Sequence, residues 1–309
     1  MRMAPSVTYM EVDDPGQRID NWLNRVLKGV PKARIYRMLR RGEVRVNGGR
    51  VKPAYRLQAG DRVRVPPVRT GRRPVPPAVR QPLGRLLGES VLFEDDGLLV
   101  LDKPAGLAVH GGSGVSHGLI EVLRATRAER FLELAHRLDR DTSGCLIVAK
   151  SRTALKALHL LHRTRQIRKT YDLLVAGRWP RKLDAVDLPL HRYVTMSGER
   201  RVRVAGHGKP SRTSFRPVST APIATWLQAR LHTGRTHQIR VHAAASGHPV
   251  LGDDKYGTGA SASASELAGP GRLCLHATRL SFDWGDARLR LDAPLPAAFT
   301  QAWDRLSGQ

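Results

Sequence analysis

The sequence has little cysteine, few aromatic residues and few acids. Its 309 residues include two cysteines, Cys145 and Cys274, which exclude a disulfide framework and a thiolate metal site. Aromatic residues make up 5% of the chain and hydrophobic residues 41%, so a core must consist mainly of aliphatic side chains. No apolar run has the length of a signal peptide or of a membrane span. We therefore expect a protein of the reducing cytoplasm, without a membrane partner.

The shortage of acids leaves the chain strongly basic. It carries 52 lysines and arginines against 27 acids, a formal net charge of +25. A general preference for arginine would spread this excess evenly. However, residues 1–80 hold 19 basic and 6 acidic residues, whereas the other 229 residues hold 33 and 21. Such a concentration predicts a polyanionic partner, and the phosphate backbone of a nucleic acid is the usual one.

Residues 17–65 are predicted to form a small unit that follows an N-terminal tail, residues 1–16. Apolar residues recur at helical spacing from Ile19 to Leu27, and a second helix is expected from about Lys32 to Arg41. Short strands with alternating apolar and basic residues follow.

The second helix of this unit carries several arginines and almost no acid. A charged helix face is often only solvated, but these arginines continue into the next loop and strand. The two helices and the segment RRGEVRVNGGRVKPAYRLQAGDRVRVP resemble the small RNA-binding domain first described in a small-subunit ribosomal protein. The resemblance implies that the second helix and the loop after it lie on RNA. The residues at the matching positions are Arg34, Arg37, Arg40, Arg41 and Arg45.

Residues 66–90 are predicted to be an extended linker, because prolines interrupt regular structure and arginines add charge. The residues concerned are Pro66, Pro67, Pro74, Pro76, Pro77 and Pro82, with Arg69, Arg72 and Arg73. Residues 91–309 are predicted to form one α+β domain with a large mixed, mostly antiparallel sheet. The reason is that expected strands outnumber helices and that strand–helix alternation is weak.

The first motif that could carry chemistry is HRLDRDTSG, from His136 to Gly144, which leads into an apolar strand. A charged loop against a buried strand can hold a carboxylate on a rigid support. An ordinary turn, in which aspartate and serine side chains bond loop amides, explains these residues equally well. A calcium loop starting at Asp139 is excluded, because its twelfth residue would be Lys150 instead of glutamate.

The second motif is GRTHQIRVH, from Gly234 to His242, and it raises the possibility of a zinc site. The histidines near it are spaced by five, five and six residues, so the two within the motif are not an i, i+4 pair on one helix face, and no HExxH sequence is present. We therefore expect no metal. The histidines concerned are His232, His237, His242 and His248. A third motif, Lys169-Thr170-Tyr171 at the start of a strand, carries no signal alone.

Taken together and in this order, the motifs resemble the pseudouridine synthase family, in the group that acts on large-subunit ribosomal RNA (the RluA/RluC group). The match begins with LDKPAGLAVHGGSG at Leu101, continues through HRLDRDTSG and KTY, and ends with GHPVLGDDKYG at Gly257. The resemblance implies a pseudouridine synthase fold and the isomerisation of uridines in that RNA. Such an isomerisation needs no cofactor and no metal. We expect a monomer by default.

The resemblance also implies roles for residues in these motifs. Asp139 is the catalytic carboxylate, and Arg240 keeps it ionised through a hydrogen-bonded pair. Tyr171 stacks on the uracil and helps to remove the proton from C5. The carboxylate has three possible acts: attack on C1′, addition to C6, or removal of the C2′ proton. The substrate-binding candidates are Arg137, which occupies the gap left by the flipped base, Ile239, an apolar wall under it, and His136 and Arg140.

Two rival functions fit parts of the sequence. A non-enzymatic ribosomal RNA-binding or ribosome-assembly protein would account for the charge alone. A zinc-dependent hydrolase would use the histidine cluster. The first rival predicts that Asp139→Asn changes nothing, whereas stoichiometric zinc in the protein would support the second.

Overall fold

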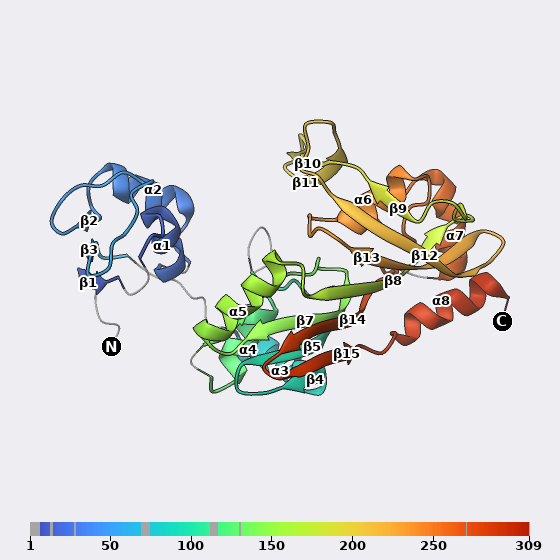
Figure 1. Cartoon of the computed structure of the whole chain (residues 1–309), viewed down its shortest axis with the longest axis horizontal. Helices are drawn as coiled ribbons and strands as arrows, with labels where there is room; N and C mark the ends of the chain where they lie inside the picture. The colour runs from blue at the N-terminus through green and yellow to red at the C-terminus, as the bar shows by residue number, and fades with distance from the viewer. Residues whose placement is uncertain are drawn as a thin grey trace. The chain divides into compact units, whose positions relative to one another are not determined.

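The computed structural model describes residues 7–12, 15–27, 29–68, 75–111, 117–129, 131–269 and 271–308 (Figure 1). The chain divides into a small unit, Met1–Pro74, and a large unit, Val75–Gln309. The predicted linker residues Arg69, Arg72, Arg73 and Pro74 lie outside the described residues.

The small unit packs two helices against a three-stranded sheet. The helices α1 (Ile19–Val26) and α2 (Lys32–Arg40) agree with the two predicted helices. The sheet has the order β1-β3-β2, with β1 (Thr8–Glu11), β3 (Arg62–Val65) and β2 (Arg45–Val46). Its core is aliphatic apart from Trp22, as the composition requires, and includes Ile19, Leu23, Ile35, Met38 and Val63.

The strand β1 corrects one prediction, because it lies in the segment that was expected to be a tail. It pairs antiparallel with β3, from Thr8 opposite Val65 to Glu11 opposite Arg62. Val12, just after the strand, is buried in the core of the small unit. Residues 7–12 are rich in β-branched and aromatic side chains, and pairing with β3 satisfies their backbone groups.

The large unit is built on a ten-stranded sheet with the order β4-β5-β7-β14-β8-β13-β12-β9, with β15 beside β14 and β6 beside β7. β7 and β14 are parallel, and the other described pairs are antiparallel, which confirms the predicted α+β class. The strands are β4 (Val91–Glu94), β5 (Leu98–Lys103), β6 (Glu133–Leu134), β7 (Ser143–Ala149), β8 (Arg168–Ala176), β9 (Ala185–Asp187), β12 (Arg212–Thr220), β13 (Ala224–Leu231), β14 (Leu275–Trp284) and β15 (Ala287–Asp292). A separate hairpin joins β10 (Leu190–Val194) to β11 (Arg200–Val204).

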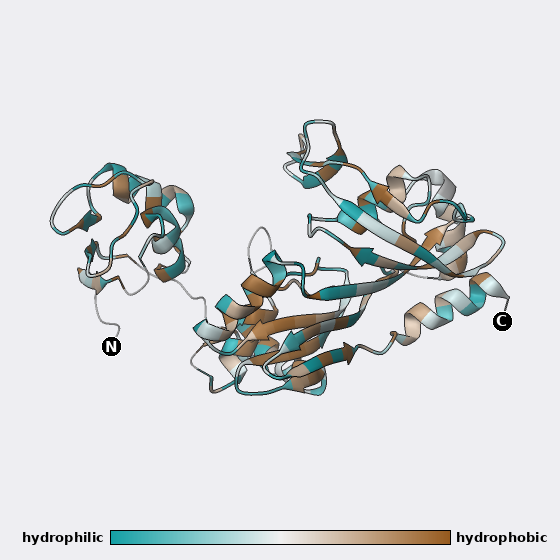
Figure 2. Cartoon of the chain, in the orientation of Figure 1, coloured by the Kyte–Doolittle hydropathy of each residue, from teal (hydrophilic) through white to brown (hydrophobic). Residues whose placement is uncertain are grey.

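Helices cover both faces of this sheet. Alternate residues of β5 point to opposite faces: Leu99 and Leu101 pack with α4, whereas Leu98 and Val100 pack with α5. Figure 2 shows the resulting apolar concentration along β5 and β7. The two helices named here are α4 (Leu119–Thr126) and α5 (Arg152–Arg163). Later in the chain the large unit also contains α6 (Gln238–Ala245), α7 (Gly259–Ala268) and α8 (Ala297–Ser307).

The helix α3 (Pro77–Glu89) corrects a second prediction, because this stretch was expected to be an extended linker. Pro77 is at the start of the helix, where the missing N–H costs nothing. Pro82 lies inside, but apolar burial outweighs the hydrogen bond that it cannot donate. Leu87 is buried in the same core as α4, with Leu83 packed against it. Leu83 and Leu87 are spaced for one helix face, a signal that the prolines obscured.

The strand β14 has a special place in the sheet. It lies between β7 and β8, although it follows both of them by more than a hundred residues in the chain. It therefore joins the half of the sheet built from β4, β5 and β7 to the half built from β8, β13, β12 and β9. Among the described residues, no helix combines the length and the hydrophobicity that crossing a membrane requires.

Two neighbouring leucines of α3 test whether this helix belongs to the large unit. Leu87 is 1% exposed and Leu86 is 40% exposed. We expect Leu87→Ala to lower the free energy of unfolding by roughly 2–5 kcal/mol, because it leaves a cavity in the core. Leu86→Ala should change it by less than about 0.5 kcal/mol. Chemical denaturation of both variants measures the difference, and equal effects would contradict the packing of α3.

Candidate active site

The loop that carries Asp139 connects β6 to β7 and is anchored on both sides. Leu138 is buried in the core of the large unit, and Gly144 lies opposite Ala277 in the parallel pairing of β7 with β14. Gly144 has φ +105°, and a Cβ there would lie 2.3 Å from the carbonyl oxygen of Ala277. The glycine of the HRLDRDTSG motif thus permits the close approach of two strands. Between these anchors the Asp139 side chain is 19% exposed.

A buried ammonium group also holds this loop, in a role that was not evident from the sequence. Lys103 is fully buried at the end of β5. Its Nζ donates hydrogen bonds to the carbonyl oxygens of Pro104 (2.8 Å), Leu107 (2.9 Å) and Arg140 (2.9 Å). Burial lowers the pKa of Lys103 to about 7, while three carbonyl acceptors match the three hydrogens of the charged form. Lys103 therefore fixes the backbone immediately after Asp139.

Arg240 lies on α6 and is held by a second carboxylate. Its Nε and Nη2 donate to the two oxygens of Asp253 at 2.7 and 2.6 Å, in a fork–fork pair whose side chains are 2% and 0% exposed. Its Nη1 lies 3.9 Å from Oδ2 of Asp139. The structure thus brings Arg240 to Asp139, but at a distance longer than a hydrogen bond. The hydrogen-bonded partners of Arg240 are Asp253 and, at 3.4 Å, Asp254, and the sequence singled out neither as a partner.

His237 is a further group beside the carboxylate, and its role was not predicted. It precedes α6 in a left-handed conformation with φ 52°. Its Nε2 lies 3.9 Å from Oδ2 of Asp139, and its Nδ1 is 2.7 Å from the hydroxyl of Tyr256. Burial lowers the pKa of His237, although the charge of Asp139 opposes this shift. The Tyr256 ring also lies 5.2 Å from the guanidinium of Arg240.

These groups surround a cavity of about 370 Å³. Asp139 and Arg240 line it together with Tyr171 and Ile239, which are both nearly buried. Burial, followed by the nearby charge of Asp139, raises the pKa of Tyr171, so its phenol is neutral. The described wall of the cavity therefore combines one carboxylate, the fixed cation of Arg240, further basic side chains, and the surfaces of Tyr171 and Ile239, which is a setting for a flat polar ligand.

The three remaining substrate-binding candidates have different surroundings. Arg137 is exposed and lines the cavity. His136 also lines it, but its Nε2 accepts a hydrogen bond from the amide of Ile147 at 3.1 Å, which ties the loop to β7. Arg140 is exposed, pairs with Asp141 at 3.1 Å and is not part of the cavity wall.

The histidines considered for zinc each have a partner of their own. His232 pairs with Ser214 at 2.8 Å, and His248 with the carbonyl oxygen of Ala176 at 2.8 Å. His242 contacts the hydroxyls of Ser211 and Thr213 at 3.0 and 2.9 Å. In the parts of the chain that the structure describes, no group of three or more potential ligands could hold a metal ion.

The predicted arginines of the small unit lie on and after α2. Arg37, Arg40, Arg41 and Arg45 are exposed. Arg34 is half-buried and forms an ion pair with Glu43 at 3.0 Å. Four of the five guanidinium groups therefore face solvent, where they can reach a polyanion.

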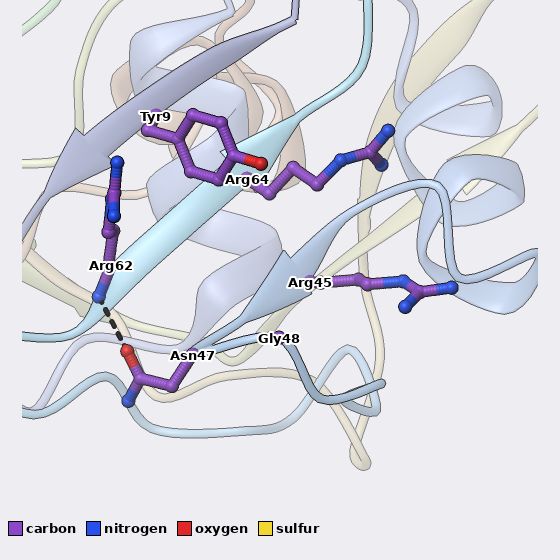
Figure 3. Close-up of a pocket in the computed structure, with 6 residues that line it drawn as sticks. All are labelled: Tyr9, Arg45, Asn47, Gly48, Arg62 and Arg64. Atoms are coloured by element: carbon purple, nitrogen blue, oxygen red, sulfur yellow. Dashed lines mark hydrogen bonds between the residues drawn. The ribbon is translucent and has the colours of Figure 1, made fainter.

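A second basic surface of the small unit lies on its sheet (Figure 3). Tyr9 stands opposite Arg64 on β3, and Arg64 stands opposite Arg45 on β2, so the three side chains form a row across the strands. Arg62 lies 4.5 Å from the centre of the Tyr9 ring, which is 53% exposed. With Asn47 and Gly48 these residues line a cavity of about 580 Å³. Arginines directly opposite each other repel, and an anion between them would relieve this repulsion.

Comparisons with known proteins agree with both units. Residues 97–245 match the family model described as RNA pseudouridylate synthase, and residues 17–63 match the S4 domain model. The protein named ribosomal large subunit pseudouridine synthase C of Yersinia pestis is 51% identical over 93% of this chain and 91% of its own length. Its namesake from Escherichia coli strain K12 is 49% identical over 98% of both chains.

A solved structure extends this likeness to the fold. The human RNA pseudouridylate synthase domain containing 4 protein superposes with a TM-score of 0.62 at 26% identity. The match covers 74% of this chain and 96% of the human one. On the strength of near full-length identity of about half to its bacterial relatives, the chain belongs to the RNA pseudouridine synthase family.

Proposed function

We propose that this protein converts specific uridines of large-subunit ribosomal RNA to pseudouridine, with Asp139 as the acting carboxylate. The observation that carries the proposal is the placement of Asp139 against the fixed guanidinium of Arg240 in a cavity walled by Tyr171 and Ile239. The bacterial relatives, whose names specify the ribosomal large subunit, support this choice of RNA.

The reaction breaks the N1–C1′ bond of a uridine, turns the uracil, and forms a C5–C1′ bond. Every atom of the substrate remains in the product, apart from the exchange of the C5 proton, so no redox partner is consumed. Asp139 has to act as an anion, whether it attacks C1′, adds to C6 or takes the C2′ proton. Nη1 of Arg240 and Nε2 of His237 both lie 3.9 Å from Oδ2 of this carboxylate.

The walls of the cavity suit a uracil ring. Tyr171 and Ile239 offer an aromatic and an aliphatic surface, between which a flat base can lie. The Tyr171 phenol is neutral because burial raises its pKa, and it would have to lose a proton before it could accept one from C5. We therefore assign Tyr171 a stacking role.

The target uridine has to leave its RNA stack before it can enter the cavity. Base flipping costs a few kcal/mol, which contacts elsewhere must supply. Arg137 is exposed at the cavity, where its side chain can enter the space that the base leaves.

The small unit supplies a second contact with RNA. Its exposed arginines on α2 bind phosphates, and the row of Tyr9, Arg64 and Arg45 adds an aromatic surface for an unpaired base. We place this activity in the cytoplasm, with ribosomal RNA as the partner and with one chain as the working unit.

The non-enzymatic alternative, an RNA-binding assembly protein, differs from this proposal at Asp139. We expect Asp139→Asn to lower kcat on the order of 10⁴-fold, because the amide has no negative charge, while RNA affinity persists. Asp141→Asn is the matched control, since Asp141 pairs with Arg140 outside the cavity. Pseudouridine formation in transcribed ribosomal RNA measures turnover. Full activity of Asp139→Asn would refute the proposed role.

Arg240 allows a second test, because a lysine at this position has the same charge but lacks the guanidinium group that forms two parallel hydrogen bonds. Arg240→Lys removes one of the two bonds to Asp253 and the fixed position beside Asp139, so we expect kcat to fall on the order of 100-fold. The control is Arg288→Lys, which alters a pair between an exposed arginine and Asp283 on the surface. Single-turnover kinetics separates an effect on chemistry from one on binding, and equal rates for both variants would remove Arg240 from the site.

Removal of residues 1–74 tests the small unit as an RNA anchor. These residues hold much of the excess charge, and the large unit begins at Val75. We expect weaker RNA binding and a flatter salt dependence, with a log–log slope that falls by about 0.7 for each phosphate that the protein no longer neutralises. Titrations at several salt concentrations give this slope. An unchanged slope would show that the small unit does not bind the phosphate backbone.

A further inference from the structure

A second cavity, of about 520 Å³, adjoins the candidate active site in the large unit. The two share His162, Lys169, Leu231, Gly234 and Arg235 as wall residues, so they are adjacent. We call the second one the basic pocket. It is lined by five arginines: Arg163, Arg165, Arg168, Arg230 and Arg235.

The arginines of the basic pocket keep their charge without an acidic neighbour. All five are exposed. None of them forms an ion pair with a carboxylate among the residues that the structure describes, and the described wall of the pocket contains no acid. This differs from Arg240, Arg201 and Arg212, each of which has an acidic partner. Five like charges around one cavity repel one another, and an anionic ligand would remove this repulsion.

The arginines of the basic pocket come from parts of the chain that are separated in the sequence. Arg163 ends α5, Arg165 follows it, and Arg168 begins β8, whereas Arg230 lies near the end of β13. Arg230 is opposite Thr170, which is next to Tyr171. The cations therefore surround the end of the strand that also carries the proposed stacking residue.

The conformation of Arg165 supports a functional role for the pocket. Its φ is +60°, a left-handed conformation in which glycine is usual after a helix. An arginine occupies this strained position, and strained backbone is often found at functional sites. The pKa of the nearby His232 is lowered by burial and then by the positive charges of Arg230, Arg212 and Arg165. The positive charge around the pocket therefore also acts on His232.

We propose, on the basis of the proposed function, that the basic pocket binds the phosphodiester backbone of the RNA immediately beside the flipped uridine. A nucleoside in the active-site cavity remains attached to its chain, and the shared wall leads that chain to the pocket. Each phosphodiester carries one negative charge, so five guanidinium groups match a run of at least two, and their forks suit phosphate oxygens. A single free anion would leave most of this charge uncompensated.

Charge reversal tests the proposal, with a control on the helix α5. The variant Arg168→Glu/Arg230→Glu should raise KM for RNA on the order of tenfold and flatten its salt dependence, with kcat changed by less than about twofold. The control is Arg152→Glu/Lys156→Glu, which changes the net charge equally on α5, outside the wall of the pocket. Equal effects of the two variants would overturn the proposal.

Arg165 allows a test in which a loss of RNA binding can be distinguished from misfolding. Arg165→Gly removes a charge but also relieves the left-handed conformation. We expect weaker RNA binding together with an unfolding temperature that is the same or higher. Unchanged affinity would contradict the role of Arg165 in the pocket.

Replacing charged phosphodiesters of the RNA with uncharged linkages shows which phosphates the basic pocket binds. Methylphosphonates on both sides of the target uridine should weaken binding to the wild-type protein, but should have less effect on Arg168→Glu/Arg230→Glu. The same linkages far from the target serve as a control. Equal weakening in both proteins would show that the pocket does not bind these phosphates. All binding assays can use Asp139→Asn protein, so they remain interpretable even if the proposed chemistry is wrong.

Discussion

The candidate site depends on the pair between Arg240 and Asp253, two almost fully buried side chains of opposite charge. A buried guanidinium without a partner would cost several kcal/mol, and Asp253 compensates that cost with two hydrogen bonds. Asp253 is itself held by the amides of Lys255 and Tyr256 at 2.9 and 3.1 Å. The third nitrogen of Arg240 lies 3.9 Å from Oδ2 of Asp139, so the same pair also fixes the position of a cation beside that carboxylate.

The sequence predicted the residues of the cavity better than their partners. Asp139, Tyr171 and Arg240 are far apart in the chain, yet the structure places all three around one cavity, as their motifs suggested. The pairing of Asp253 with Arg240 was not predicted, because the partner of this guanidinium depends on how α6 packs. No local sequence pattern reveals that packing. Lys103 was missed for the same reason, since its three carbonyl acceptors come from loops that only the folded chain assembles.

The two errors in the fold have a common physical origin. The prolines of residues 66–90 led to the prediction of an extended linker, and residues 1–16 were expected to be an N-terminal tail. In both cases tertiary burial decided the structure: Leu87 packs into the core of the large unit, and Val12 into that of the small unit. Local propensity underestimates such segments because their stability comes from contacts that are distant in sequence. The sheet class, in contrast, followed from patterns repeated along many strands.

The position of β14 between β7 and β8 also governs when the sheet of the large unit can be completed. During synthesis at about 5–20 residues per second, β7 and β8 emerge long before the strand that joins them. Until residues 275–284 have appeared, the loop of Asp139 and the strand of Tyr171 belong to halves of a sheet that are not yet connected. A nascent chain must therefore include residues 275–284 before the two halves can form one sheet.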